Sequence, residues 1–398
     1  MRGAIITAAT FAISCLLTAC PQDPDGCSTF EGEWPEEAFD AQGFLRCEVT
    51  PELCNLPVES VMREPDLDRA IDIVIVPDGY PASRLPLFQA QVRGWIDALD
   101  RSPDSIIGRD PSLFNFHVIE IISDGSQRYR PLRSCTRYDT GITVSDPARR
   151  ARVALNAPDA DVILVVTDDS EIVYDEMSYG GMRDSASLDW EILPYSHLSR
   201  STLPETLDHE LGHSLIGLGD EYVDAGEAGM SVTSPYVARR GNPLPPNVSY
   251  SPEGDWNGLV EGAFEGAFHR AHGYYRPSEN CRMRETRAAY CPVCSDAIHR
   301  ALGGHRGVQD GPPQCGVAST GPAESWSVFG RDGNGIVDVS LTVDGRAVPA
   351  SGFRWHRPHG EHHAPRWFSL TYWQEARAIT VRCTDALGAT SETTLNVP

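Results

Sequence analysis

The sequence contains no lysine, so all 33 of its basic side chains are arginine, and its formal net charge is −23. A surface of this charge repels phosphate backbones and anionic headgroups, which argues against nucleic acid as a partner. Long apolar runs are also lacking, because after residues 4–19 no stretch reaches the roughly 18 residues of a permanent membrane helix. Hydrophobic residues still make up 41% of the chain, which excludes wholesale disorder.

The first 19 residues are typical of a secretory signal, since Arg2 precedes an apolar stretch, 4–19, that is too short to span a bilayer permanently. The signal ends in the string LTAC, residues 17–20, which resembles the lipobox of bacterial lipoproteins. In a lipobox the cysteine is acylated and becomes the first mature residue. The alternative is an ordinary signal with a chance cysteine. The sequence therefore predicts an exported protein of the bacterial cell envelope, periplasmic or surface-exposed, that is anchored to the membrane by lipid on Cys20.

Eleven cysteines occur in the chain. Cys15 is removed with the signal and Cys20 is the predicted lipid site, which leaves nine cysteines in an oxidising compartment. Disulfides are therefore expected, with one thiol unpaired. Residues 20–65 are rich in proline, aspartate and glutamate and show no sustained period. We interpret them as a tether followed by a small cysteine-containing N-terminal segment that a disulfide pins, with Cys27, Cys47 and Cys54 as the available cysteines.

Residues 66–305 have the pattern of an α/β domain. Short apolar runs at 71–76, 114–122 and 162–166 are typical of buried strands, and residues 87–99 carry apolar side chains at helical spacing. Strands that alternate with helices predict a mostly parallel, mixed sheet with helices packed against it.

Residues 312–398 form the second predicted domain, which a stretch rich in glycine and proline separates from the first. Segments such as 337–343 and 378–383 alternate polar and apolar residues between Asp-Gly turns. This pattern predicts a small all-β, immunoglobulin-like sandwich. Cys315 and Cys383 lie near its two ends and could form a disulfide, although spacing alone does not fix the pairing.

The string HELGH, residues 209–213, is predicted to lie on a helix. Thr202 and Glu205 match a capping box, with the threonine as N-cap, and Pro204 suits the first turn. The helix also has an apolar face of three leucines spaced by four: Leu207, Leu211 and Leu215.

His209 and His213 are one helical turn apart and point the same way, so each can give a ring nitrogen to one Zn²⁺ ion. Glu210 lies about 100° further round the helix, where it can hold a water on the metal. In such a site the zinc activates the water, and the glutamate acts as general base and acid, taking the proton of the water and passing it to the leaving amine.

A third zinc ligand is expected just after this helix. Gly217 is predicted to end the helix and Gly219 to let the chain turn back beneath the metal. Asp220 and Glu221 follow. We favour Asp220 as the ligand, with Glu221 as the alternative.

The segment 209–218, followed by Asp220-Glu221-Tyr222, resembles the signature of the M64 metallopeptidases, a family named for a bacterial enzyme that cleaves immunoglobulin A. The similarity extends over about residues 70–300. It includes five further segments: 76–80, 114–116, 179–181, 281–283 and 291–294.

The resemblance implies a zincin-like catalytic domain of the metzincin type, in which a methionine turn lies beneath the zinc ligands. Met283 is the candidate for that methionine. The glycine stands at position 217, one residue later than in the usual metzincin pattern, and the third ligand shifts with it. Tyr222 is a candidate for a supporting hydrogen bond to the reacting carbonyl oxygen. Four other residues are weaker candidates for the same part: Tyr195, His197, His269 and Tyr274.

Cys281, Cys291 and Cys294 allow two interpretations. A CxxC pair is common in structural zinc sites, but the sequence shows no fourth ligand and no second pair. Export favours disulfides. We therefore expect bridges that clamp the loop carrying Met283.

The motifs together predict an exported, lipid-anchored zinc endopeptidase that holds one catalytic Zn²⁺ and acts on proteins or peptides. No G-x-S-x-G elbow and no phosphate loop stands out, so a serine hydrolase and a nucleotide enzyme are set aside. The rival hypothesis is a surface binding lipoprotein whose metal is structural and whose sandwich recognises a ligand. That hypothesis predicts a zinc site closed by four protein ligands.

Overall fold

The computed structural model describes residues 36–38, 45–61, 63, 70–123, 147–158, 160–168, 177–179, 195–223, 245–254, 256, 258–260, 262–305, 313–319, 325–331, 336–348, 367–373, 378–385 and 387–396. The predicted signal and the lipid site Cys20 lie outside these residues, as do Gly180 and Gly181. Within the described part, no helix combines the length and the apolar character that crossing a membrane requires.

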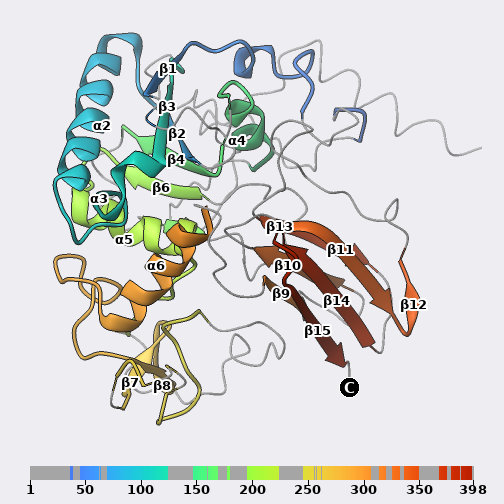
Figure 1. The fold of residues 1–398 in the computed structure, drawn as a ribbon. Helices are drawn as coiled ribbons and strands as arrows, with labels where there is room; N and C mark the ends of the chain where they lie inside the picture. Colours follow the sequence, from blue (N-terminus) through green and yellow to red (C-terminus); the bar gives the residue numbers. More distant parts are fainter. Residues whose placement is uncertain are drawn as a thin grey trace, which may run out of the picture.

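A six-stranded sheet forms the centre of the N-terminal region, in the order β1-β3-β2-β4-β6-β5 (Figure 1). Its strands are β1 (Val58–Val61), β2 (Ile71–Asp78), β3 (Phe114–Ile119), β4 (Val162–Thr167), β5 (Met177–Tyr179) and β6 (Tyr195–Ser199). The four central strands are parallel, and the edge strands β1 and β5 run antiparallel to their neighbours. The prediction of a mostly parallel mixed sheet is confirmed. The sequence analysis did not predict the strands β5 and β6, which also belong to this sheet.

The central strands β2, β3 and β4 are mostly apolar because both faces of the sheet are covered, and the buried polar side chains Asp72, Asn115 and His117 hydrogen-bond to one another. Every residue of β2 is buried. Ile71, Ile73 and Ile75 belong to one hydrophobic core together with apolar side chains of α2 (Leu85–Asp100), α5 (Pro204–Leu211) and α6 (Pro292–His305). Val74 and Val76 point the other way and pack with α4 (Pro147–Ala154). This alternation is the period of two that a strand imposes on its side chains.

Short elements connect these layers. They are η1 (Glu36–Ala38), η2 (Pro51–Leu53), η3 (Ala82–Arg84), α3 (Ile106–Arg109) and η4 (Pro111–Leu113). After α5 come one π-helical turn, η6 (Gly212–Ile216), and a two-stranded antiparallel sheet of β7 (Phe264–Ala267) and β8 (Arg270–Arg276).

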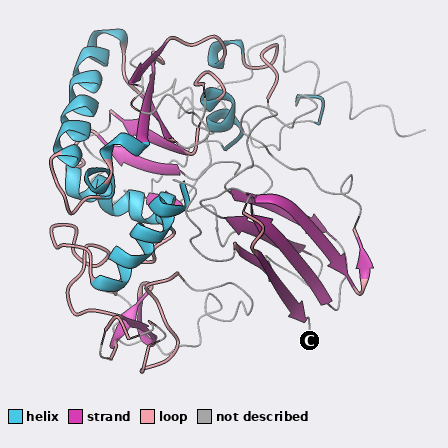
Figure 2. Cartoon of the chain, viewed as in Figure 1, coloured by secondary structure: helices cyan, strands magenta, loops and turns pink. Residues whose placement is uncertain are grey.

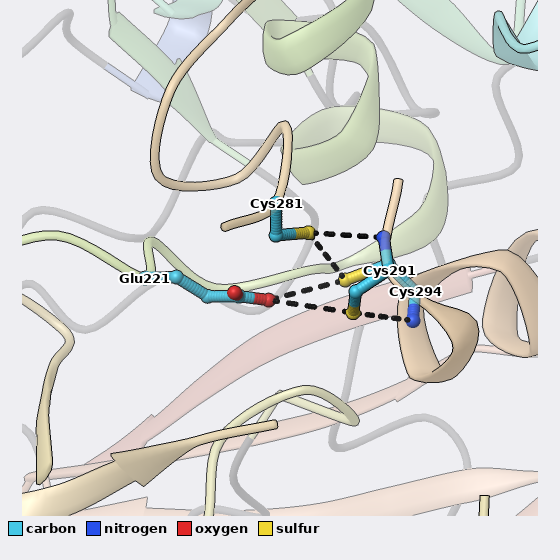
Figure 3. Close-up of side chains that lie close together, drawn as sticks. All are labelled: Glu221, Cys281, Cys291 and Cys294. Carbon is cyan, nitrogen blue, oxygen red and sulfur yellow. Dashed lines mark hydrogen bonds between the residues drawn. The ribbon is translucent and has the colours of Figure 1, made fainter. Parts of the chain in front are cut away.

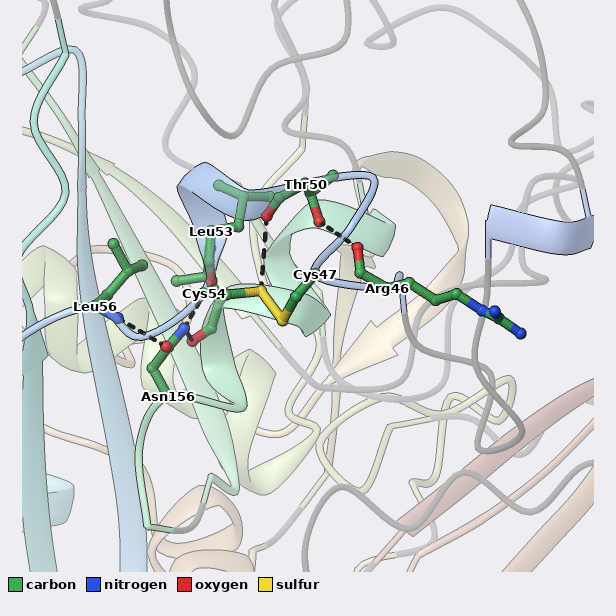
Figure 4. Close-up of a disulfide and its surroundings, with 8 residues drawn as sticks. Arg46, Cys47, Thr50, Leu53, Cys54, Leu56 and Asn156 are labelled. Carbon is green, nitrogen blue, oxygen red and sulfur yellow. Dashed lines mark hydrogen bonds between the residues drawn. A yellow bond between two sulfur atoms is a disulfide. The ribbon is translucent and has the colours of Figure 1, made fainter. Parts of the chain in front are cut away.

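The N-terminal segment is attached to the main sheet through a small disulfide loop. Cys47 and Cys54 are bonded on either side of η2 (Figure 4). Asn156, just after α4, donates to the carbonyl oxygen of Leu53 at 2.9 Å and accepts from the amide of Leu56 at 2.9 Å. A disulfide in this segment was predicted, and it is present.

The residues that the structure describes between 313 and 396 form strands and turns and contain no helix (Figure 2). One sheet contains β9 (Gln314–Ser319), β10 (Ser325–Arg331) and β13 (Trp367–Trp373), and the other contains β11 (Ile336–Val343), β12 (Arg346–Ala347), β14 (Ala378–Asp385) and β15 (Thr390–Asn396). All pairings are antiparallel. Cys315 on β9 and Cys383 on β14 form a disulfide between the two sheets, as the sequence suggested.

Candidate metal centre

The two histidines of the motif lie on a helix that changes form between them. His209 is on α5, and His213 is on the π-helical turn η6 that continues it. The turn ends at Gly217, whose φ of 75° lies in the left-handed region that glycine adopts without strain. The predicted helix end is therefore confirmed.

The capping box that was predicted for this helix is wrong. The N-cap is Leu203, and it makes no side-chain capping bond. The Thr202 hydroxyl instead accepts the amide of Ser199 at 3.0 Å, because it belongs to the turn that follows β6. Pro204 takes the first helical position, where its missing amide hydrogen costs nothing.

The structure brings His209, His213 and Asp220 together. The two Nε2 atoms are 3.1 Å apart, and the Asp220 Oδ1 atom lies 3.3 Å from the first and 3.2 Å from the second. Three corners of a tetrahedral zinc site with bonds of 2.0–2.1 Å lie about 3.3–3.4 Å from one another. The three atoms therefore fit one metal ion without rearrangement.

Main-chain oxygens orient both rings. The Nδ1 atom of His209 donates to the carbonyl oxygen of Arg282 at 2.8 Å, and that of His213 donates to the carbonyl oxygen of Leu218 at 2.7 Å. A proton on Nδ1 leaves the lone pair on Nε2, which is the atom that a metal requires. The carbonyl of Arg282 is itself held in place, because its guanidinium pairs with the buried carboxylate of Asp208.

The charges of the cluster attract one another. Burial by itself would lower the pKa of His213, but the Asp220 carboxylate overrides that effect and raises the pKa to about 9. Burial acts to raise the pKa of Asp220, yet three imidazoles hold it well below its usual range. The third of these is His269, whose Nε2 atom is 3.0 Å from Asp220 Oδ2. Asp220 is thus held as a carboxylate beside both histidines.

Glu210 is buried, with 5% of its surface exposed, and its Oε2 atom has no hydrogen-bond partner among the described residues. It is close enough to raise the pKa of His213 through its charge. A buried carboxylate oxygen left without a partner is costly unless water or an ion satisfies it. Such an oxygen is available to hold a water molecule or to accept a proton.

Met283 is fully buried and lies against the helix between the two histidines. A Cβ atom at Gly212 would be 2.9 Å from the Met283 sulfur and 3.3 Å from the Tyr290 hydroxyl, so only glycine allows this approach. The main-chain oxygen of Met283 accepts the amide of Glu221 at 2.7 Å. Met283 therefore packs against the histidine helix at Gly212.

Glu221, the alternative third ligand, turns away from the histidines. It is completely buried, and its Oε1 atom lies 3.3 Å from the Cys294 sulfur and 4.0 Å from the Cys291 sulfur (Figure 3).

The prediction of disulfides among these cysteines is wrong: Cys281, Cys291 and Cys294 are free thiols. The Cys281 and Cys294 sulfur atoms are 3.6 Å apart, which is far beyond the roughly 2.05 Å of a bond.

The remaining candidates have different surroundings. The ring of Tyr222 packs edge-on against that of His269, with centroids 4.9 Å apart. Tyr274 is buried and packs against Phe268 and Tyr250. Of Tyr195 and His197, the structure describes only the main chain, on β6.

Sequence reasoning did not find three residues that support the cluster, Asp208, Arg282 and Asn247, and it gave His269 a different role, a hydrogen bond to the reacting carbonyl oxygen. His269 contacts Asp220, and Asp208 holds Arg282. Asn247 exchanges two hydrogen bonds of 2.8 Å with the main chain of Gly219 and donates to Glu221 at 2.9 Å. No short motif connects Arg282, Asn247 or His269 to the histidines, because each comes from a segment that meets the helix only in the folded chain. Asp208 directly precedes His209 on α5, but its pairing with Arg282 also depends on the fold.

One comparison with known proteins bears on this site. Residues 253–302 match the family model described as IgA Peptidase M64, which is a short part of the chain. The matched segment begins after the histidine helix, and it contains β7, β8, Met283, the three free cysteines and most of α6. A metallopeptidase family is therefore supported over this segment. No curated protein matches the chain.

Proposed function

We propose that the protein is a zinc-dependent endopeptidase. The observation that carries the proposal is the triangle of ligand atoms from His209, His213 and Asp220, with sides of 3.1–3.3 Å. These residues would hold the ion, and Zn²⁺ is the metal that suits two imidazoles and a carboxylate. The family match supports a peptidase, and with it a protein or peptide as the substrate.

Zinc bound there would lower the pKa of a water molecule and polarise a peptide carbonyl. The residues of the chain divide the remaining work. Glu210 Oε2, which has no described partner, would take a proton from the attacking water and return it to the leaving amine. Arg282 and Leu218 keep the imidazoles in the correct tautomer through their carbonyl oxygens.

The rival hypothesis, a binding lipoprotein with a structural metal, requires a site that protein ligands close. In the described part of the chain, the metal-binding group around the histidines contains only three residues: His209, His213 and Asp220. Three ligands leave one tetrahedral position open, as in catalytic zinc sites. A structural site also has no need of a buried carboxylate such as Glu210.

The finer features of the fold fit the same proposal. A parallel sheet followed by the histidine helix, the left-handed Gly217 and a buried Met283 is the arrangement expected of a metzincin-like domain, here assigned to residues 66–305. Residues 312–398 would form an immunoglobulin-like sandwich, in which the disulfide between Cys315 and Cys383 joins the two sheets.

We further propose that the enzyme is exported and tethered to a membrane of the bacterial envelope through lipid on Cys20, after removal of residues 1–19. The LTAC string supports this proposal. Metabolic labelling with a fatty-acid analogue should mark the wild-type protein and leave Cys20→Ser unmarked. Equal labelling of both would refute the anchor.

The enzymatic proposal is tested by cleavage of an unfolded protein with purified wild type and Glu210→Gln. The variant should lose about 10²-fold or more of the activity and still retain zinc at the histidines, because Glu210 is not a ligand. A chelator should abolish wild-type cleavage, and added zinc should restore it. Unchanged activity in Glu210→Gln would refute the assigned role.

A further inference from the structure

A second cluster of potential metal ligands lies next to the first. Glu221, Cys281, Cys291 and Cys294 each offer one ligand atom, and these atoms all lie within 4.8 Å of one another. All four residues are buried, with 0–4% of their surfaces exposed. Their side chains point toward a common centre from three segments of the chain: the turn after η6, the loop before α6, and the start of α6 (Figure 3).

The separations suit a shared ion better than a disulfide. In a tetrahedral zinc site, two sulfur ligands lie about 3.8 Å apart, and a sulfur and an oxygen lie about 3.5 Å apart. The Cys281 and Cys294 sulfurs are 3.6 Å apart, and Glu221 Oε1 is 3.3 Å from Cys294 and 4.0 Å from Cys291.

Main-chain amides favour thiolates at this place. The amide of Cys291 points at the Cys281 sulfur, 3.3 Å away, and the amide of Cys294 points at the Cys291 sulfur, 3.5 Å away. Hydrogen bonds of this kind stabilise a sulfur that bears negative charge. The second of them belongs to a CxxC pair at the first turn of α6, a spacing that recurs in structural zinc sites.

In the described part of the chain, Arg276 interacts with Glu221 through its charge, but the two side chains form no ion pair. No ion pair connects Glu221 to an arginine or histidine in the described part of the chain, and its Oε2 atom has no hydrogen-bond partner there. Burying a carboxylate beside three thiols is costly unless a cation is present.

We propose that Glu221, Cys281, Cys291 and Cys294 bind a second, structural zinc ion. Four protein ligands close its coordination, so this ion would not take part in catalysis. Thiolates select a soft or borderline metal, which favours Zn²⁺ over Mg²⁺ or Ca²⁺. A bound metal would also protect the three thiols from pairing in an oxidising compartment.

The second site would brace the first. Glu221 directly follows Asp220, and Cys281 precedes Arg282 and Met283, whose main-chain oxygens accept hydrogen bonds from His209 and Glu221. A metal between these segments would fix the third ligand and the support of His209 relative to each other. Only this bracing role rests on the proposed peptidase function; the metal site does not.

Metal analysis and cobalt spectroscopy of the full-length protein test the proposal. The wild type, purified under reducing conditions, should contain two zinc ions per chain. After exchange with Co²⁺, it should show the intense near-ultraviolet absorption of a cobalt–thiolate bond, which two imidazoles and a carboxylate cannot give. One metal per chain without this absorption, or a disulfide among the three cysteines in the exported protein, would overturn the proposal.

Variants separate the two sites. Cys294→Ser and Glu221→Gln should each lower the metal content to one ion and weaken the thiolate absorption, whereas Glu253→Gln, an exposed glutamate, should change neither. His213→Ala should lose the other ion and the peptidase activity but keep the absorption. If Cys294→Ser fails to fold, the wild-type spectrum and the metal content of Glu221→Gln still decide whether the second zinc site exists. Two ions retained in Glu221→Gln with unchanged absorption would exclude Glu221 as a ligand.

Discussion

Asp220 and Glu221 are neighbours in the chain, yet their carboxylates belong to two different clusters. Asp220 lies 3.2–3.3 Å from the ring nitrogens of His209 and His213. Glu221 lies among three cysteines, and its amide is held by the main chain of Met283. Consecutive residues in extended chain point in opposite directions, so one short segment can contribute to both clusters.

The clusters differ in what holds them in shape. Both imidazoles donate to main-chain oxygens, and Asp220 has His269 as a further partner. The cysteines mainly contact one another and Glu221. The histidine cluster is therefore organised by the protein before any metal binds, as its proposed catalytic role requires, whereas a metal would itself organise the cysteine cluster.

The ion pair that supports the histidine cluster gives the largest expected effect. Asp208 and Arg282 are both buried and bonded to each other, so Asp208→Ala would leave a buried guanidinium without its partner. We expect the free energy of unfolding to fall by about 3–5 kcal/mol. Denaturant titration of the metal-loaded protein measures this loss.

Asp100→Ala is the matched control, since the pair of Asp100 with Arg63 is partly exposed, at 25% and 22% of the side chains. Its loss should cost at most about 1 kcal/mol. Similar losses of unfolding free energy in the two variants would mean that the buried Asp208–Arg282 pair stabilises the protein no more than a partly exposed pair does.

Exchanging the two neighbouring carboxylates for amides tests the comparison directly. Asp220→Asn should lower kcat/KM by about 10²-fold, because an amide is a poor zinc ligand and the imidazoles lose their charge partner. Glu221→Gln should lower it by less than about tenfold, as an effect transmitted through the loop. Cleavage kinetics with zinc analysis measures both variants. The reverse order would assign Glu221 to the catalytic ion.

The spacing of residues along the chain predicted those features that the geometry of a single helix or strand determines. The histidine pair follows from the helical repeat, the end of the helix at Gly217 follows from the left-handed conformation that glycine adopts, and short apolar runs such as 71–76 indicated strands buried on both faces. The placement of Asp220 beside the histidines follows from the turn at Gly217.

The sequence could not show contacts that depend on how distant segments meet. Glu221 reaches the cysteines only because the loop before α6 docks beneath the helix, so the cysteines were predicted to form disulfides for want of a fourth ligand. His269 reaches Asp220 through the turn between β7 and β8, whose Phe268 amide donates to the Asp220 carbonyl at 2.8 Å. The capping box was wrong because Thr202 serves the preceding turn.

The contact between Gly212 and Met283 joins the helix of the first cluster to the loop of the second. Gly212→Ala would place a Cβ atom 2.9 Å from the Met283 sulfur, so we expect a loss of about 1–3 kcal/mol in the free energy of unfolding. Gly94→Ala, within α2, is the control, since nothing lies within 4 Å of a Cβ there. It should be stabilising, by about 0.5–1 kcal/mol. If Gly212→Ala is also stabilising, the close packing is not present in solution.

The smallest effect is expected from Met283→Leu, which keeps the volume of the side chain and removes the sulfur. The sulfur is not part of either metal-binding group, and the bond that ties Met283 to Glu221 uses its main-chain oxygen. The cost in unfolding free energy should therefore be less than about 1.5 kcal/mol, with unchanged metal content and nearly unchanged cleavage. A variant that folds but loses zinc or most of its activity would show that the thioether acts on the histidine cluster electronically. The two clusters would then be connected by more than the main chain and the packing between them.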